Sequence, residues 1–177
     1  IFLAERLGSK PPLIPSDPNE RSAMFGLLHE IAGENGFGWS SRLSMLHQTM
    51  SLPPESVGAM RAIFERLGDA YGYSTATGEA AGGRTAEILR FLSARLEEQQ
   101  ARGSAFFIGD RLSAADIYWA AFAALVRPLP DELCPMREVV RQNYTVTDST
   151  LVDAASQLLL ENRLRIYEAH MELPIRL

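Results

Sequence analysis

Ten consecutive apolar or aromatic residues, from Ile117 to Val126, constrain the fold more than any other part of the sequence. A helix that is apolar on every side must be surrounded, either by other parts of the protein or by lipid. Because a helix needs about 20 apolar residues to cross a bilayer, this run is too short to be a membrane span. The sequence therefore predicts a helix over residues 113–127 that is buried among other helices.

The start of this helix carries a specific N-terminal signal, Ser-Ala-Ala-Asp at residues 113–116. As N-cap, Ser113 can accept a hydrogen bond from the backbone N–H of Asp116, and the Asp116 carboxylate can accept one from the N–H of Ser113. Leu112 and Ile117 flank this capping box at the two positions of a hydrophobic staple. An Asp at this position is far more often a cap than a catalytic acid, so these residues are interpreted as folding determinants.

Three segments of the chain resemble one protein family. Residues 107–117, Phe-Ile-Gly-Asp-Arg-Leu-Ser-Ala-Ala-Asp-Ile, are similar to the capping-box and staple signature in the all-helical C-terminal domain of glutathione transferases. Residues 13–21 resemble the interdomain linker of that family and the first turn of the helix that follows it. Residues 163–167, with Leu173-Pro174 after them, resemble the closing helix and tail of some bacterial members. The resemblance covers nearly the whole chain.

This resemblance implies an all-α fold, a helical bundle around the central helix, and a particular domain organisation. Residues 1–8 are expected to be the tail of a thioredoxin-like domain that precedes Ile1, residues 9–16 a linker, and residues 17–177 the all-helical C-terminal domain. The chain begins with Ile and not with Met, so it is expected to be a piece of a longer one. In the family, the thioredoxin-like domain binds most of the glutathione and activates its thiol, so the catalytic residue is expected outside this chain.

The spacing of apolar residues and the turn signals predict the other helices. Asp17 and Glu20 form a second capping box, which starts one long helix that is interrupted by Gly-rich residues 33–38 and ends at Met50. Further helices are expected over residues 53–73, 84–102, 136–143 and 149–170. Residues 74–83 are small, polar and Gly-rich, so they are expected to be a surface loop, and the tail after residue 171 is expected to be extended.

The Gly-rich interruption, Asn35-Gly36-Phe37-Gly38-Trp39, is the candidate substrate site. In the family, the middle of the corresponding long helix lines the pocket for the acceptor substrate. Asn35, Phe37 and Trp39 are therefore expected to offer one polar group and two aromatic faces to an apolar electrophile. The alternative is that Phe37 and Trp39 fill the core at a bend, as aromatic residues beside glycines usually do.

Residue types and spacings argue against several other chemistries. His29-Glu30 begins like a zinc-protease motif, but Gly33 stands where the second His is needed, and His47 and His170 have no ligand at metal-binding spacing. No metal is therefore expected. Cys134 is the only cysteine, which fits a reducing cytosol, and it is interpreted as an inert thiol and not as a nucleophile.

Charge and composition bear on partners and on location. The net charge is −5 and no basic cluster is present, so neither nucleic acid nor an anionic membrane is expected as a partner. No signal peptide or transmembrane span is visible, and the protein is expected to be cytoplasmic. Lys10 is the only lysine among 17 basic residues, which together with abundant Ala suggests a bacterial, GC-rich genome.

Two functions follow from the resemblance. The first is a glutathione transferase-like enzyme that joins glutathione, its co-substrate, to an apolar electrophile, with this chain supplying the acceptor pocket. Its homodimer contact is expected along residues 18–50 and 53–73. The second is a non-catalytic relative in which the same helices bind hydrophobic ligands or other proteins, because folds of this kind are reused for functions other than catalysis.

Overall fold

A computed structural model describes residues 6–8, 11–58 and 61–175 of the chain. This part of the chain is helical and contains no strand, so the prediction of an all-α fold is confirmed. Its elements are α2 (Pro18–Ala32), α3 (Phe37–Met50), α4 (Pro54–Val57), α5 (Arg61–Tyr71), α6 (Thr75–Ala101), α7 (Ala114–Phe122), the 3-10 helix η2 (Ala123–Leu125), α8 (Glu138–Tyr144), α9 (Ser149–Ala154) and α10 (Gln157–His170).

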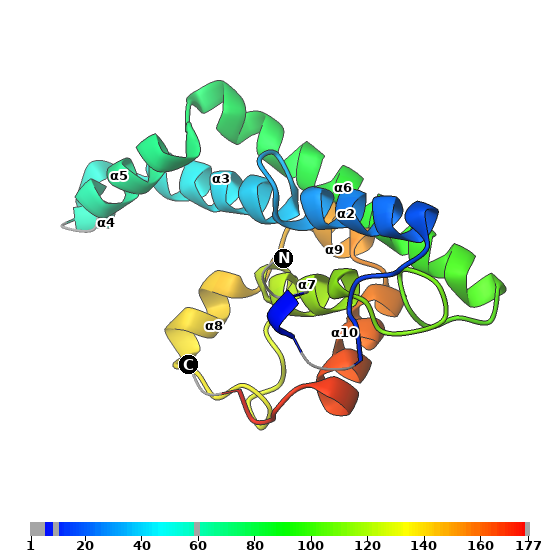
Figure 1. The fold of residues 1–177 in the computed structure, drawn as a ribbon. Helices are drawn as coiled ribbons and strands as arrows, with labels where there is room; N and C mark the ends of the chain where they lie inside the picture. The colour runs from blue at the N-terminus through cyan, green and yellow to red at the C-terminus, as the bar shows by residue number, and fades with distance from the viewer. Residues whose placement is uncertain (1–5, 9–10, 59–60, 176–177) are drawn as a thin grey trace.

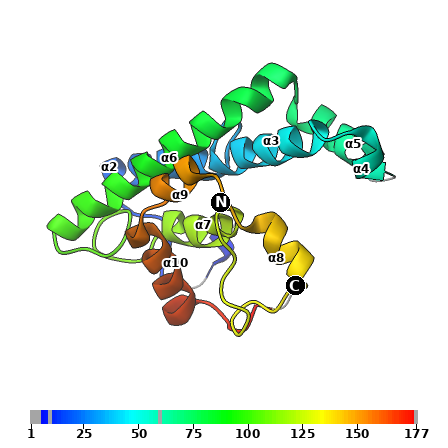
Figure 2. The same ribbon diagram turned by 180° about the vertical axis from the view of Figure 1, so that it is seen from behind.

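The long helices form one layer, and the central helix lies against it. Helices α2 and α3 follow one another almost in line, α6 runs alongside them, and α7 lies below (Figure 1). Helix α3 packs on α6, α2 on α7, and α9 on α6, while α10 contacts both α7 and α6. The view from behind shows α9 between α6 and the start of α10 (Figure 2). Helices α4 and α5 lie at the outer end of α3, away from α7.

Helix α7 carries the centre of the core. The Trp119 side chain has no exposed surface, its ring centroid lies 5.7 Å from that of Phe37, and its indole N–H donates to the Leu159 carbonyl at 3.0 Å. This satisfied N–H lets the largest side chain type be buried without an unpaired polar group. Around it lie fully buried residues of the neighbouring elements, among them Met24, Ile31, Leu89, Leu92 and Phe107.

The capping box at the start of α7 is present and is more extensive than predicted. Asp116 Oδ2 accepts from the backbone N–H of Ser113 at 2.9 Å and from its hydroxyl at 2.8 Å. The other carboxylate oxygen, Oδ1, accepts from the backbone N–H of Phe107 at 2.9 Å. Asp116 therefore closes the loop before the helix as well as the helix start itself.

The central helix is shorter than predicted and is open on one side. The α-helix ends at Phe122 and continues as η2 to Leu125, and Ala121 is exposed. Phe122, Ala124 and Leu125 are partly exposed, because no described element covers this side of α7 and η2. The apolar run is therefore partly core and partly the wall of a pocket.

The prediction of a loop over residues 74–83 is wrong, because these residues form the first turns of α6. Ser74 and Thr77 form a capping box in which the Ser74 N–H donates to Thr77 Oγ1 at 2.7 Å and the Thr77 N–H donates to Ser74 Oγ at 3.1 Å. Gly78 allows close contact with α3, since a Cβ there would lie 2.6 Å from His47 Nδ1. A local cap and tertiary packing thus outweigh the poor helix propensity of the glycines.

Two other predicted helices are interrupted. Residues 53–73 divide into α4 and α5, because Gly58 has φ +55° and ends α4. The apolar stripe of α5 is also poorly covered: only Gly68 is buried, and Leu67 remains 42% exposed. Residues 149–170 divide into α9 and α10, because Ala155 leaves the helical region at ψ 81° and Ser156 caps the next helix.

The remaining boundaries agree more closely. Residues 18–50 form two helices separated by residues 33–36, and the short helix predicted at 136–143 spans Glu138–Tyr144. Some predicted segments fall partly outside the described residues. Residues 1–5 belong to the expected domain tail over 1–8, and residues 9–10 to the expected linker over 9–16. Residues 59–60 of the predicted helix 53–73 and residues 176–177 of the C-terminal tail also lie outside.

Candidate functional site

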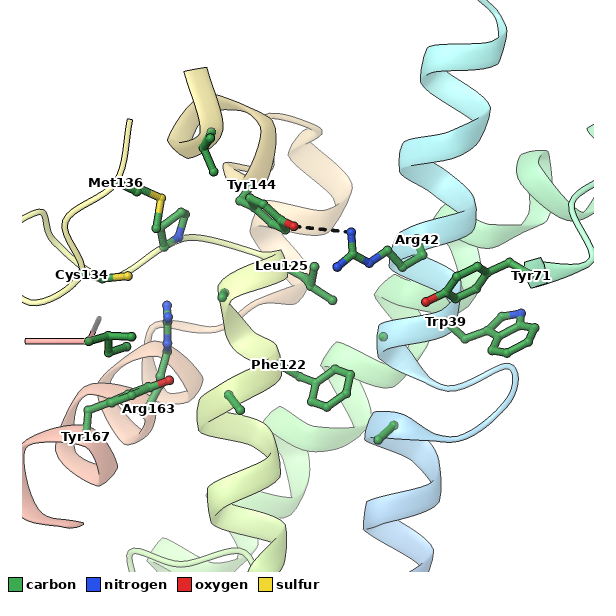
Figure 3. A pocket seen from close by; sticks show the side chains of 17 residues that line it. Trp39, Arg42, Tyr71, Phe122, Leu125, Cys134, Met136, Tyr144, Arg163 and Tyr167 are labelled. Carbon is green, nitrogen blue, oxygen red and sulfur yellow. Dashed lines mark hydrogen bonds between the residues drawn. The ribbon is translucent and has the colours of Figure 1, made fainter. Parts of the chain in front are cut away.

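A mostly apolar pocket of about 580 Å³ lies on the open side of α7 and η2 (Figure 3). Its volume falls within the range of about 300–1,000 Å³ that is usual for small-molecule sites. Three parts of the chain line it: α3 with the end of α5, then α7 with η2, and finally the segments around Cys134, Tyr144 and Tyr167. The pocket is therefore built from residues that are far apart in the sequence.

The first wall comes from α3. Trp39 packs against Tyr71 of α5, with ring centroids 4.8 Å apart, and both rings line the pocket. One turn further along α3, Arg42 reaches toward Tyr144 of α8, whose hydroxyl it meets at 3.5 Å (Figure 3). The Arg42 guanidinium also lies 5.7 Å from the centre of the Tyr144 ring. This contact joins the two sides of the pocket.

The floor comes from α7 and η2. Phe122 and Leu125 point from these helices into the space between the other two walls (Figure 3). Gly38 of α3 makes this arrangement possible, because a Cβ at that position would lie 2.3 Å from a ring carbon of Phe122. The Gly-rich interruption therefore serves the close approach of α3 to the central helix.

The third wall adds further polar groups to Arg42 of the first wall. Cys134 and Met136 precede α8, while Arg163 and Tyr167 lie one turn apart on α10. The Arg163 guanidinium points from α10 toward the segment that carries Cys134 and Met136 (Figure 3). Its Nη1 donates to the Arg127 carbonyl, and burial lowers the pKa of Arg163, while nearby Tyr167 and Cys134 act in the opposite direction.

The structure separates the three residues that were predicted to contact a substrate. Trp39 lines the pocket. The Phe37 side chain has no exposed surface and packs on Trp119, so it belongs to the core, as the alternative interpretation held. Asn35 is exposed and is not among the lining residues; it has φ 57°, and its carbonyl accepts from Arg84 Nε at 3.1 Å. A role in substrate contact is therefore kept for Trp39 alone.

The turn before Trp39 is held by an ion pair. Arg84 of α6 bonds to the Asn35 carbonyl and also to Glu30 of α2, whose carboxylate lies 2.7 Å from Nη2. The same guanidinium thus connects α2, the interruption and α6. This contact fixes the angle at which α3 begins and, with it, the position of Trp39.

Sequence patterns did not reveal Arg42, Tyr144, Arg163 and Tyr167 as pocket residues. One usable signal was present: Arg163 lies on the same face of α10 as the buried residues Leu159 and Ile166. An arginine on the apolar face of a helix is unusual, since charged side chains are rarely fully buried without a partner. The other three gave no such signal, because the pocket depends on contacts between distant segments.

Two searches of the described residues had negative results. No group of three or more His, Cys, Asp or Glu side chains within 6–8, 11–58 and 61–175 is arranged to hold a metal ion. In the same ranges, no helix is both long and apolar enough to cross a membrane.

Comparison with known protein families gives a match to part of the chain. The family model described as "Glutathione S-transferase, C-terminal domain" matches residues 58–142, a range that includes α5, α6, α7 and the capping box. Neither the curated proteins nor the solved structures contain a significant match to the chain.

Proposed function

Because the chain contains a C-terminal domain of the glutathione S-transferase family, we propose that it forms the acceptor-substrate half of an enzyme that joins glutathione to an apolar electrophile. Proteins of this family generally use glutathione and dimerise. In this proposal the catalytic residue and most of the glutathione site belong to a thioredoxin-like domain before residue 9. The helical domain from residue 17 onward binds the acceptor.

The observation that carries the proposal is the open apolar side of α7 and η2. Trp39, Phe122 and Leu125 expose apolar surface toward a pocket large enough for a molecule of drug size. Exposed apolar surface of this kind marks a ligand or partner site more often than it marks incomplete folding. The aromatic faces of Trp39 and Tyr71 suit a flat, apolar or aromatic acceptor.

The proposal includes a cytoplasmic homodimer. Support for self-association comes from three exposed apolar side chains: Leu52, in the turn between α3 and α4, and Ile63 and Leu67 of α5. Apolar residues of this type cluster in the centre of homodimer interfaces. No metal takes part in the proposed reaction.

Two measurements on the full-length protein test the proposal: retention on immobilised glutathione, and turnover of a chloronitroaromatic acceptor in the presence of free glutathione. Retention with turnover is the expected result. If the protein shows no retention and no turnover, the proposal is contradicted. That result would favour the non-catalytic alternative, in which the same pocket holds a hydrophobic ligand or a protein partner. Retention without turnover of any electrophile in an acceptor panel would remove the transferase assignment.

A further inference from the structure

Arg163 is an unusual arginine in this protein. Its side chain is buried, with 4% of the residue exposed, and no Asp or Glu of the described residues forms an ion pair with it. Other arginines are paired with carboxylates, as Arg84 is with Glu30 and Arg141 with Asp131. A buried charge without a counter-ion is unfavourable, because the interior solvates it far less well than water does.

The protein satisfies only part of the Arg163 guanidinium. Nη1 donates to the Arg127 carbonyl, and the guanidinium lies 5.7 Å from the centre of the Tyr167 ring. Nε is buried and has no hydrogen-bond partner. Buried donors are nearly always paired in folded proteins, so an unpaired one beside a pocket needs an explanation.

The pocket beside Arg163 has a consistent charge. Its lining includes a second arginine, Arg42, and contains no Asp or Glu among the described residues. Arg42 bonds to the Tyr144 hydroxyl and has no carboxylate partner within the described ranges. The chain as a whole carries a net charge of −5, so this basic lining is a local property of the pocket.

We propose that the pocket takes an acceptor with a carboxylate on an apolar body, and that Arg163 binds this carboxylate. The inference rests on the proposed function, since it names the class of acceptor for the same pocket. The apolar part of the ligand lies against Trp39, Tyr71 and Phe122, and its acid group lies in the third wall.

A carboxylate fits the site better than a larger anion. A guanidinium presents its N–H groups in a planar fork that matches the two oxygens of a carboxylate. The Arg127 carbonyl uses one N–H of Nη1, and the remaining N–H groups of a single guanidinium offer one planar fork for two oxygens, whereas a phosphate group presents three. Arg42 is positioned on the opposite wall and adds long-range attraction for the negative charge.

Glutathione also has carboxylates, so the experiment separates the two sources. The probes are 4-phenylbutyrate, its neutral analogue 4-phenylbutanol, and glutathione, each titrated into the full-length protein by calorimetry. In the wild type, 4-phenylbutyrate is expected to bind at least about 10-fold more tightly than the alcohol, which is typical of a hydrogen bond to a charged group. Equal affinities would overturn the inference without the use of any variant.

Arg163→Gln removes the charge and keeps polar character. The affinity for 4-phenylbutyrate is expected to fall to that for 4-phenylbutanol. The affinity for 4-phenylbutanol is expected to change less than about 2-fold. The matched control is Arg165→Gln, which removes the same charge from the same helix; Arg165 bonds to the Ala105 carbonyl and does not line the pocket. Equal losses of 4-phenylbutyrate affinity in both variants would overturn the inference.

The glutathione titration completes the test. Its affinity is expected to be the same in Arg163→Gln as in the wild type, and 4-phenylbutyrate is expected to bind in the presence of saturating glutathione. A loss of glutathione affinity in Arg163→Gln would assign the guanidinium to glutathione and overturn the inference. If 4-phenylbutyrate and 4-phenylbutanol bind with equal affinity, the carboxylate subsite is excluded but the acceptor pocket is not. If neither ligand binds, the acceptor pocket is excluded as well.

Discussion

At the scale of single residues, polar side chains hold the loop between α6 and α7. Asp116 accepts from Phe107 and Ser113, and the Gln99 amide donates to the carbonyls of Phe106 and Gly109, both at 2.9 Å. Arg95 Nε donates to the Phe107 carbonyl at 3.0 Å. Loops are usually stabilised by water, but this one lies against the core, so side chains must satisfy its backbone groups.

The capping box predicts an order of stability among variants. Asp116→Ala strands the buried N–H groups of Phe107 and Ser113 and is expected to cost about 2–5 kcal/mol, the sum of a cap and unpaired buried donors. Ser113→Ala removes only the hydroxyl and is expected to cost about 0.5–2 kcal/mol. Urea unfolding of both variants measures the difference, and a larger loss in Ser113→Ala would contradict this account.

The buried carboxyl also predicts a pH dependence. Burial raises the pKa of Asp116 above the usual range of an aspartate, although the hydrogen bonds from Phe107 and Ser113 and the charge of Arg165 oppose the shift. A carboxyl group whose pKa is higher in the folded state than in the unfolded state stabilises the fold fully when the pH is below the pKa of the unfolded state. This stabilisation is lost as the pH rises through the pKa of the folded state. The wild type should therefore gain stability relative to Asp116→Asn when the pH falls from neutral to about 4. Urea unfolding at both pH values checks this, and a relative loss at the lower pH would contradict it.

At the scale of helices, glycines decide how closely α3 approaches α7 and how closely α6 approaches α3. Gly38 lets α3 meet Phe122 of α7, and Gly78 lets α6 meet His47 of α3. His47 also bonds to the Tyr73 hydroxyl, with 3.2 Å between Nδ1 and the oxygen. These two positions require glycine because it has no side chain, and not because it is conformationally flexible.

A pair of substitutions in α6 separates packing from helix propensity. Gly78→Ala places a Cβ 2.6 Å from His47 Nδ1 and is expected to destabilise the protein by about 1–3 kcal/mol through overpacking. The control is Gly82→Ala, where a Cβ meets no atom within 4 Å and alanine should stabilise the helix by about 0.5–1 kcal/mol. Thermal unfolding gives the sign of each change. Stabilisation by Gly78→Ala would show that α3 and α6 do not meet closely there.

Helix starts were predictable from the sequence to the extent that they depend on neighbouring residues. The signals at Asp17 and at Ser113 need only four residues each, and both helices begin where these residues predict, although at Asp17 only the N-cap half of the predicted box is formed, by its bonds from Asn19 and Glu20. The start of α6 is not predicted, because the glycines and small polar residues of 74–83 indicate a loop, whereas in the structure Ser74 and Thr77 cap a helix there. The break between α9 and α10 has a local signal, the Ser156 N-cap, but the apolar spacing of residues 149–170 predicts one continuous helix.

At the scale of the whole molecule, two apolar regions of the described residues remain uncovered. One is the pocket beside α7, and the other is the exposed apolar side of α5, where Ile63 is 51% exposed and Leu67 42%. A pocket suits a small ligand, and an exposed apolar helix surface suits a protein partner.

Self-association through α5 is expected to be sensitive to a single charge. Leu67→Glu should weaken the homodimer at least about 10-fold, because a buried charge at an interface has no partner. The control is Phe91→Glu, which changes another exposed apolar residue, 49% exposed on α6. Sedimentation equilibrium of the two variants measures the effect. An unchanged dimer constant in Leu67→Glu would exclude α5 from the interface.

The pocket as a whole was beyond prediction from the sequence. The Gly-rich interruption predicts a substrate site at the start of α3; Trp39 lines the pocket there, whereas Phe37 lies in the core against Trp119. Arg163 and Tyr167 approach the site from α10, and only the folded chain places them near Cys134. Residues that meet across such distances leave no periodic signal.

The most direct test of the account is the effect of Trp39→Ala on the two substrates of the full-length protein, with Phe91→Ala as the control aromatic outside the pocket. Loss of the indole from the pocket wall is expected to raise the dissociation constant of an apolar acceptor about 10-fold, since it removes a buried aromatic contact. The dissociation constant of glutathione is expected to stay the same. Equal increases in the two dissociation constants, or no increase in either, would contradict the assignment of this pocket to the acceptor.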